Sequence, residues 1–522
     1  MADPIPTNDG LPPASAVIPP MPSQTPNKVI VKGNIVQHVT HIEKSSSAAQ
    51  DAFKSLHDQI CVAAYENSDE HDEMKCFPGT RTSLLQLLEE WTVIPANERR
   101  PMVWLDGPMG AGKTAVARSI AERVSRREKL LGIFIFRRGE PYRNNASRFI
   151  TTLSYQIALS IPLARPYIEQ QIIHDPSIFQ QSLSRQLQAL VINPLQNIRT
   201  HHPDLDPITL PNVLIVDGLD ECGGDIQGDQ RKKEMQIAVL DLLHRLVQRS
   251  DILPFAILVH SRPERQIKNW FTIDQHRHIT YRATLAASYD SDRDIELFVK
   301  HSFLMILACH PSRYSLPPNW PLDTSPKKLN PHEHPTATWP VVEEIVRKSS
   351  GHFIYASIVM KYVASPYHEP NKRLNDILSS GNAGGNSSDS PVTILDALFH
   401  QILEAAGDRY NTMQILCYNS ISTTFRNRSV GSDGTVYGYF GSALDPYIFD
   451  ILGISQQEFD TWMAHMAPLL ERERCYAYSH FLRFHHTSFS EFLNSKERAK
   501  HWTIDPWLCL RFIVRFASKA LK

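Results

Sequence analysis

Short runs of consecutive apolar residues, separated by longer stretches with helical spacing, dominate the chain between residues 102 and 261. The runs are Met102–Leu105, Leu131–Phe136, Val213–Val216 and Phe255–Val259. Continuous apolarity, without alternating polar residues, is typical of strands that are buried on both faces. The pattern therefore predicts an α/β domain whose parallel sheet is covered by helices.

An amphipathic helix is predicted directly after Thr114. Apolar residues recur there at helical spacing, and charged residues occupy the other positions around the turn. The apolar positions are Val116, Ala117, Ile120, Ala121 and Val124. Beyond about residue 290 strand signals become sparse, and helices are predicted over Asp294–Leu307, Val341–Val363 and Ile394–Ala405.

The N-terminal part has a different character. Residues 1–27 are rich in proline and poor in large apolar residues, which predicts disorder. Lys28–Ile42 is β-branched and predicts a short strand or hairpin around Gly33. This strand either packs onto the body of the protein or pairs with a strand of another chain.

A glycine-rich motif connects the first apolar run to the predicted helix. It satisfies G-x-x-x-x-G-K-[ST], with strand and helix in the right order. Its glycines let backbone N–H groups approach phosphates, Lys113 supplies a positive charge for them, and the Thr114 hydroxyl is a hard ligand for Mg²⁺. The candidate nucleotide-binding residues are Gly107, Pro108, Met109, Gly110, Ala111, Gly112, Lys113, Thr114 and Ala115.

The third apolar run ends in an acidic cluster. Asp217 closes the strand and is predicted to hold Mg²⁺ together with Thr114. Asp220 and Glu221 follow, and we expect them to orient or polarise a water molecule for attack on the γ-phosphate. The alternative for this pair is a solvated acidic loop.

An arginine follows the fourth apolar run in the segment His260-Ser-Arg262-Pro. At the carboxyl end of its strand, Arg262 is placed to reach the γ-phosphate. The alternative is an ordinary surface arginine at a strand end. We assign Asp220, Glu221 and Arg262 as the candidate catalytic residues.

These motifs resemble those of the NACHT class of STAND NTPases. The resemblance is carried by Gly107–Thr114, Val213–Glu221 and His260–Pro263, and it is strongest to the NACHT proteins that filamentous fungi carry in large numbers. Further agreement comes from the segments Lys75–Arg81, Ser147–Ile157, Gly351–Ala356, Leu395–Leu398 and His486–Leu493.

The resemblance implies a switch: ADP holds the protein closed, and exchange for ATP opens it to form a homo-oligomer. It implies that ATP, not GTP, is bound. His486 matches the family's winged-helix histidine that contacts the β-phosphate of ADP, and Arg81, with Thr80, matches the approach to the adenine and ribose. Signalling in fungal innate immunity or heterokaryon incompatibility is the role that this family suggests.

The expected organisation has five parts. They are a disordered tail (1–27), an N-terminal segment with a short strand and helix (28–80), a NACHT P-loop domain (81–275), a helical domain ending in a flexible Gly/Asn/Ser linker at Ser379–Ser390 (276–390), and a winged-helix-like region (391–522). Family members usually end in a sensor repeat, whereas this chain stops at Lys522. We therefore expect a truncated member, a regulatory fragment, or one that works with a separate sensor or effector.

The charge composition bears on which classes of binding partner are expected. Lys plus Arg is 54 and Asp plus Glu is 55, so nothing in the charge balance favours nucleic acid or an anionic membrane. In the C-terminal region Arg472, Arg474 and Arg483 are mixed with Glu471, Glu473 and Glu491, which favours a solvated charged face over a phosphate groove.

Other sites and compartments are also constrained. No apolar run is long enough to span a bilayer. The seven cysteines are scattered, with none at C-x-x-C spacing, which favours a reduced, cytoplasmic compartment. Neighbouring side chains point apart in a strand or helix, so the pairs His201-His202 and His485-His486 make no natural chelate.

Three functions remain open at this stage. The first is a signalling switch with slow ATP hydrolysis. The second is a catalytic P-loop ATPase or kinase with a small-molecule or mechanical role, for which Arg137 and Arg138 are the available candidate side chains. The third is a scaffold with an inactive site, against which the intact Lys113, Thr114, Asp217 and Glu221 speak.

Overall fold

The chain divides into two compact units, Met1–Ser47 and Ala48–Lys522, and every described strand belongs to the second. The computed structural model describes residues 47–65, 75–138, 140, 142–223, 229–285, 291–321, 339–380, 390–417, 453, 455–475, 479–504, 507, 509–511, 514 and 518. The expected Pro-rich tail, the expected strand over residues 28–42 and most of the expected linker lie outside these residues.

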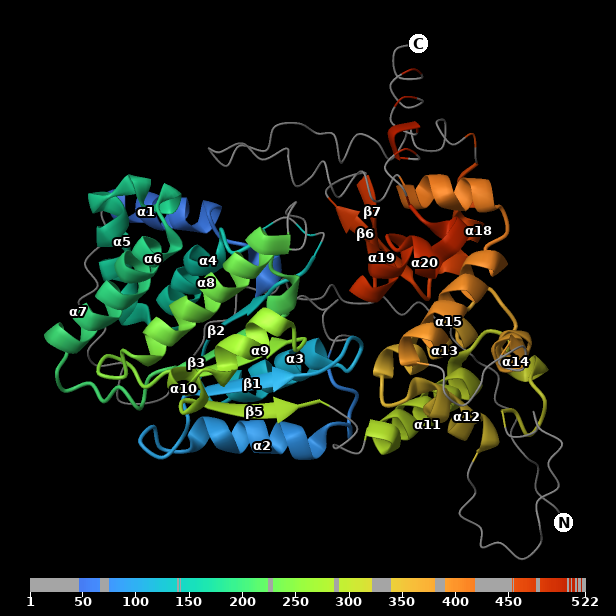
Figure 1. Cartoon of the computed structure of the whole chain (residues 1–522), viewed down its shortest axis with the longest axis horizontal. Coiled ribbons are helices and arrows are strands. Elements are labelled where there is room, and N and C mark those ends of the chain that lie inside the picture. Colours follow the sequence, from blue (N-terminus) through green and yellow to red (C-terminus); the bar gives the residue numbers. More distant parts are fainter. Residues whose placement is uncertain are drawn as a thin grey trace, which may run out of the picture. The chain divides into compact units, whose positions relative to one another are not determined.

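A five-stranded parallel sheet forms the first part of the second unit (Figure 1). Its order is β2-β3-β4-β1-β5, so β4 lies between β1 and β3. The strands are β1 (Met102–Asp106), β2 (Leu130–Ile135), β3 (Val213–Asp217), β4 (Ala256–Ser261) and β5 (Thr280–Thr284). The predicted α/β class is confirmed, and each of the four apolar runs is a strand.

The fifth strand, β5, was missed from the sequence for a physical reason. It lies at the edge of the sheet beside β1, and Tyr281 and Arg282 in its centre are exposed. An edge strand does not need continuous apolarity, because part of its surface faces water. Its sequence therefore carries a weak strand signal.

The two faces of the sheet are covered by different helices. Along β1, Val103 and Leu105 face a core that contains α2 (Thr82–Val93) and α3 (Lys113–Ser125). Met102 and Trp104 face the other core. All five apolar positions predicted for the helix after Thr114 are buried in the first of these cores.

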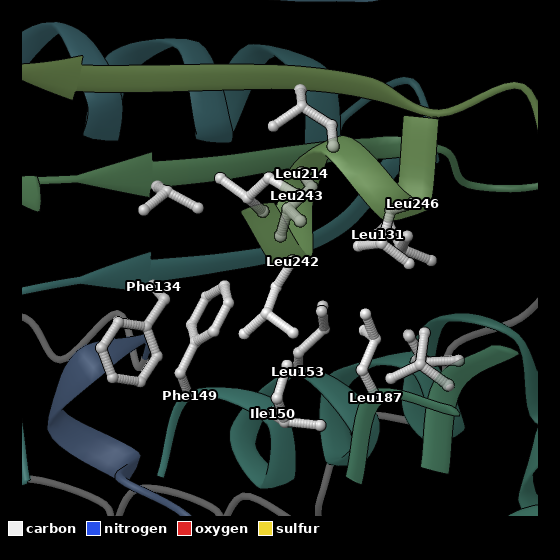
Figure 2. Packing of buried hydrophobic residues seen from close by; sticks show 14 of the residues in the cluster. Leu131, Phe134, Phe149, Ile150, Leu153, Leu187, Leu214, Leu242, Leu243 and Leu246 are labelled. Atoms are coloured by element: carbon white, nitrogen blue, oxygen red, sulfur yellow. The ribbon is translucent and has the colours of Figure 1, made fainter. Parts of the chain in front are cut away.

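The second face is covered by a larger set of helices. Figure 2 shows Phe134 of β2 and Leu214 of β3 packing against Phe149 of α4 and Leu243 of α8. The helices of this part are α1 (Ser47–Asp58), α4 (Phe149–Ser160), α5 (Arg165–His174), α6 (Leu183–Leu187), α7 (Asn193–His201), α8 (Asp229–Val247), α9 (Arg265–Thr272) and α10 (Asp274–Arg277). This core fixes β3 and β4, whose carboxyl ends carry the acidic cluster and Arg262.

A third core joins the helical region to the C-terminal region. Its helices are α11 (Ser291–Cys309), α12 (Pro340–Ser349), α13 (Phe353–Val363), α14 (Pro370–Ser380), α15 (Pro391–Ala405), α18 (Gln456–Met466), α19 (Thr487–Leu493) and α20 (Lys496–Ala499). An antiparallel pair, β6 (Leu470–Cys475) and β7 (Ser479–Phe484), lies between α18 and α19 in the chain. The described part thus continues from the α/β domain into helices, and a winged-helix arrangement stays a prediction.

The single helix predicted over Val341–Val363 is wrong, because the structure has two helices there. Ser350 and Gly351, between α12 and α13, both adopt left-handed backbone angles, with φ of 47° and 77°. A left-handed residue ends an α-helix, and glycine takes that conformation without a steric penalty. The apolar periodicity continues across the break and conceals it.

None of the helices in the described part of the chain is both long enough and apolar enough to cross a membrane.

Candidate functional site

The glycine-rich loop runs from the end of β1 to the start of α3. Gly110 and Gly112 both have left-handed backbone angles, with φ of 73° and 92°. Such angles are costly for residues with a Cβ atom, so glycine is needed where the loop turns. The loop leads directly into α3, whose first N–H groups and helix dipole would stabilise an anion bound at the loop.

Lys113 is folded back onto its own loop. Its Nζ donates to the carbonyl oxygens of Gly107 and Pro108 at 2.8 and 2.9 Å. Burial lowers the pKa of Lys113, while nearby Asp220 opposes that shift and Arg262 reinforces it. The ammonium therefore stands within electrostatic reach of the acidic cluster and of Arg262.

Thr114 and Asp217 meet across the gap between α3 and β3. The Thr114 hydroxyl donates to Asp217 Oδ2 at 2.7 Å. The other oxygen, Asp217 Oδ1, is buried and has no hydrogen-bond donor among the described residues. His260 Nδ1 lies 3.3 Å from Oδ1 and 3.1 Å from the Lys113 carbonyl oxygen.

The Asp217 carboxylate and the Thr114 hydroxyl supply oxygens of the kind that bind a hard cation. Burial alone would raise the pKa of Asp217, but His260 and Thr114 outweigh burial and hold the pKa below its usual value. The carboxylate is therefore charged at neutral pH. A charged carboxylate beside a hydroxyl, at the start of the helix that follows a glycine-rich loop, fits Mg²⁺. No group of three or more His, Cys, Asp or Glu in the described residues could hold a metal by itself.

Asp220 and Glu221 are not a solvated acidic loop. Asp220 is buried, and its Oδ1 accepts a hydrogen bond from the Arg262 backbone N–H at 2.9 Å. Glu221 Oε2 accepts one from the Arg138 backbone N–H at 2.9 Å. Burial, reinforced by the negative charge of Asp220, raises the pKa of Glu221 to about 7. A carboxylate with that pKa can take up and release a proton near neutral pH.

Arg262 is held between two carboxylates. Its Nε lies 3.1 Å from Asp220 Oδ2. Its terminal nitrogens Nη1 and Nη2 donate to the two oxygens of Glu491 in α19, at 3.2 and 2.8 Å. Arg138 Nη1 donates to the same Glu491 at 3.2 Å.

Glu491 therefore corrects the sequence interpretation of the C-terminal charges. The sequence pattern predicts a solvated charged face for it, but it joins an ion-pair cluster with Arg262 and Arg138 at the candidate site. Burial would raise the pKa of Glu491, yet Arg262 and Arg138 outweigh burial and keep the pKa below its usual value. Glu491 is charged in this cluster.

The residue before α19, His486, faces the same cluster. Its Nδ1 accepts a hydrogen bond from the Ser488 backbone N–H at 3.0 Å, so it caps the helix. Burial, together with the positive charges of Arg262 and Lys113, lowers the pKa of His486 to about 3. Its neighbour Thr487 donates to Glu221 Oε1 at 3.3 Å.

Arg81, the residue before α2, also contacts the glycine-rich loop. Its Nη2 donates to the Ala111 carbonyl oxygen at 3.2 Å, and its Nη1 donates to Ser291 Oγ at 2.9 Å. Its own backbone is left-handed, with φ of 54°. Arg81 thus connects the loop to the first turn of α11.

The helical region contacts the glycine-rich loop through hydrogen bonds and side-chain packing. His352 Nδ1 bonds to the Met109 carbonyl oxygen at 2.8 Å, and the Ile354 N–H donates to the Gly110 carbonyl oxygen at 3.4 Å. A Cβ atom on Gly110 would stand 2.3 Å from Ile354 Cγ2. The Met109 side chain packs against the third core.

One cavity of about 930 Å³ brings most of the predicted residues together. Met109 through Ala115 line it, as do Arg81, Asp217, Asp220, Glu221, Arg262 and His486. Gly107 and Pro108 instead face Lys113 through their carbonyl oxygens. Aromatic side chains of Phe77, Phe298 and Phe353 line a further part of the cavity.

The sequence interpretation missed the roles of Glu491, Thr487 and His352. Each of them lies in a segment that carried the family resemblance, but no local pattern showed that those segments meet the glycine-rich loop. Their contacts with the loop and the acidic cluster join residues more than 220 positions apart.

The family model described as "Nephrocystin 3, N-terminal" matches residues 79–262. A chain of a solved structure titled "Structure of Drosophila ORC bound to DNA" is 12% identical, with a TM-score of 0.22, over 89% of this chain and 93% of that chain. No curated protein matches the chain. Over the segment that holds the glycine-rich loop, Asp217 and Arg262, the chain is similar to the N-terminal region of nephrocystin 3, and its parallel sheet is that of a P-loop-like α/β domain.

Proposed function

We propose that this protein is a nucleotide-controlled switch of the NACHT class of STAND NTPases, which binds ATP or ADP with Mg²⁺ and hydrolyses ATP slowly. The cradle of the glycine-rich loop supports phosphate binding, and the pair Thr114–Asp217 supports binding of Mg²⁺. The mixed charge of the chain supports a role that does not depend on nucleic acid.

One observation carries the proposal: α19 and the residues beside it hold the side chains proposed for hydrolysis. Thr487 bonds to Glu221, Glu491 bonds to Arg262, and the Phe484 carbonyl oxygen accepts from Arg137 Nη2 at 2.8 Å. An enzyme built for rapid turnover needs these groups free to move with its substrate. A switch needs an element that responds to the ligand bound in the site, and α19 directly contacts the side chains of the site.

Each residue has a distinct task in this proposal. Backbone N–H groups of the loop and Lys113 hold the phosphates, and Lys113 must leave the Gly107 and Pro108 carbonyl oxygens to do so. Thr114 and Asp217 hold the metal ion, which neutralises phosphate charge when bound. Glu221 orients a water molecule, and Asp220 keeps Arg262 directed at the γ-phosphate.

Switching requires that ATP favour a second, open arrangement. A nucleotide changes the balance between two states only by the difference of its affinities for them. We propose that ADP favours the arrangement described here, and that ATP favours one in which α19 has left the site and copies of the chain assemble. A separate sensor or effector then completes signalling, in the cytoplasm, in fungal innate immunity or heterokaryon incompatibility.

A catalytic ATPase or kinase is the weaker proposal. Its candidate side chains, Arg137 and Arg138, are engaged by Phe484 and Glu491, so they are not directed at a substrate. No contact of the described residues favours this class over the switch.

The test is purification of the full chain, identification of the nucleotide that it retains, and size measurement in ADP and in ATP. Lys113→Ala is expected to weaken nucleotide binding by roughly 10- to 150-fold, because a charge-assisted contact is lost. The matched control is Lys129→Ala, since Lys129 also donates to two carbonyl oxygens, of Ile208 and Thr209, away from the site. Equal retention of nucleotide by the Lys113 variant and the wild type would refute the proposal.

A further inference from the structure

The anion that Arg262 holds in this structure is a side chain from another region of the protein. Glu491 lies 229 positions further along the chain, and its two carboxylate oxygens accept from the two terminal nitrogens of Arg262. Arg138 contributes a second guanidinium to the same carboxylate. This fork is the arrangement in which arginine binds carboxylates and phosphates alike.

We propose that Glu491 is a specificity-determining residue of the nucleotide site, because its carboxylate competes with the terminal phosphate of a nucleoside triphosphate for Arg262. A diphosphate lacks that terminal group and leaves the pair intact. The inference rests on the proposed function and adds to it the residue that distinguishes the two nucleotides.

The contacts of Arg262 divide its donors between two tasks. Asp220 takes the backbone N–H and lies next to Nε, which fixes the direction of the side chain. Glu491 accepts hydrogen bonds from both terminal nitrogens. A phosphate group that reached the same fork would displace Glu491 and leave Asp220 in place.

Charge sharpens this competition. Lys113, the phosphate-binding cation, is within electrostatic reach of Arg262, and His486 is within reach of Lys113, Arg262 and Glu491. A terminal phosphate held by Lys113 therefore approaches Glu491 as a like charge. Repulsion of like charges in a partly buried site is weakly screened by salt, so it opposes a triphosphate more than a diphosphate.

Displacement of Glu491 has a second effect, because α19 is a single short helix. Thr487, on the same helix, bonds to Glu221 Oε1. When Glu491 leaves Arg262 and the helix moves, Glu221 loses that donor and becomes available to a water molecule. Occupation of Arg262 by a phosphate and release of the hydrolytic carboxylate are thus linked through α19.

The experiment compares the affinities of the full-length Glu491→Gln variant and the wild type for ADP and for a non-hydrolysable ATP analogue, both with Mg²⁺. Glutamine keeps the size of the side chain but removes its charge. We expect the ratio of triphosphate to diphosphate affinity to rise about tenfold, within the range typical of coupling between sites. The rise should come from tighter triphosphate binding, with ADP affinity nearly unchanged.

The matched control is Asp396→Asn. Asp396 in α15 forms a fork of the same kind with Arg498 in α20, at 2.7 to 3.3 Å, but it does not line the cavity. This variant should leave the ratio unchanged. If Glu491→Gln does not fold, Glu491→Asp replaces it: the shorter side chain keeps its charge, and a smaller rise in the ratio is expected.

The outcomes separate the inference from the function on which it rests. An unchanged ratio in a folded variant that binds both nucleotides overturns the inference and leaves the switch proposal standing. Equal changes in both affinities also overturn it, since they indicate a merely structural role for Glu491. Failure of the wild type to bind either nucleotide overturns both proposals.

Discussion

The two sides of the candidate site are built in different ways. The side with the glycine-rich loop is local: the loop, Lys113 and Thr114 are contiguous, Asp217 ends β3, and Arg262 follows the neighbouring strand β4. The covering side is remote: Thr487 reaches Glu221 across 266 positions, and Glu491 reaches Arg138 across 353.

This difference separates what is fixed from what can change. The strands on the local side are held by backbone pairing within a buried sheet, so they are less able to move than the cover. The cover is held by a few ion pairs and hydrogen bonds from one helix, α19, and by the contacts of His352 and Ile354 with the loop. Variants of single residues on each side therefore test whether the two sides act separately.

The largest effect is expected from Glu221→Gln, on the boundary between the two sides. Glutamine has one carbonyl oxygen, which can accept from Arg138 or from Thr487 but not from both as the two oxygens of Glu221 do, and it cannot take up a proton. Steady-state ATP hydrolysis should therefore fall about 10²- to 10⁴-fold while ATP binding is retained. Hydrolysis is measured as phosphate release. Glu169→Gln, which alters a buried carboxylate paired with Arg165 away from the site, is the control. Wild-type turnover of the Glu221 variant would remove the role assigned to this residue.

A smaller effect is expected where the cover touches the loop. Gly110→Ala should destabilise the folded chain by about 3 kcal/mol, because a methyl group meets Ile354 and the left-handed backbone is strained. Gly112→Ala introduces backbone strain without a steric contact, because a Cβ atom there has nothing within 4 Å. It should lower the free energy of unfolding by about 1 kcal/mol. Stability is measured by urea unfolding.

The Ile354 contact is isolated by adding Ile354→Ala to the Gly110 variant, which should recover part of the loss. Equal destabilisation by the two glycine substitutions, with no recovery in the double variant, would mean that α13 does not press on the loop.

The smallest effect is expected from the pH dependence of the cover. The pKa of His486 is about 3 in the folded chain, below the ordinary 6.5 of histidine. Between these values the unfolded chain binds a proton that the folded chain does not, so stability is full above about pH 6.5 and is lost as pH falls. From pH 7.5 to 5.5 the loss attributable to His486 is about 1 kcal/mol.

The measurement for His486 is urea unfolding at both pH values. His486→Asn keeps an acceptor for the Ser488 N–H and should remove that share of the loss. His202→Asn, a substitution at an exposed position, should leave the loss of stability at low pH unchanged. An identical pH slope in wild type and the His486 variant would show that this residue does not carry the effect.

Much of the sheet could be predicted from the sequence, because its strands are short apolar runs and its loop is a specific motif. The positions of Thr114 and Asp217 relative to each other followed from the rule that parallel strands end at one edge. The edge strand β5 was missed, since its exposed Tyr281 and Arg282 break the apolar pattern. These successes and failures follow from the same cause, which is how completely water is excluded from each strand.

The cover could not be predicted in the same way. Glu491 is one charged residue among many, and only its distance from Arg262 in space distinguishes it from a solvated side chain. The break between α12 and α13 depends on the backbone angles of Ser350 and Gly351, which leave the apolar spacing intact. Contacts between distant segments are set by tertiary packing, and a local pattern holds no record of them.

Met109 gives the glycine-rich loop an anchor outside its own domain. Its side chain packs with the core shared by the helical and C-terminal regions, while the next residues lead into α3 against the sheet. The glycine-rich loop is therefore attached to two different hydrophobic cores. Unfolding of the helical core would remove one of the two attachments of the loop. Because the loop links the two cores, we expect the α/β part and the helical part to unfold in one cooperative thermal transition.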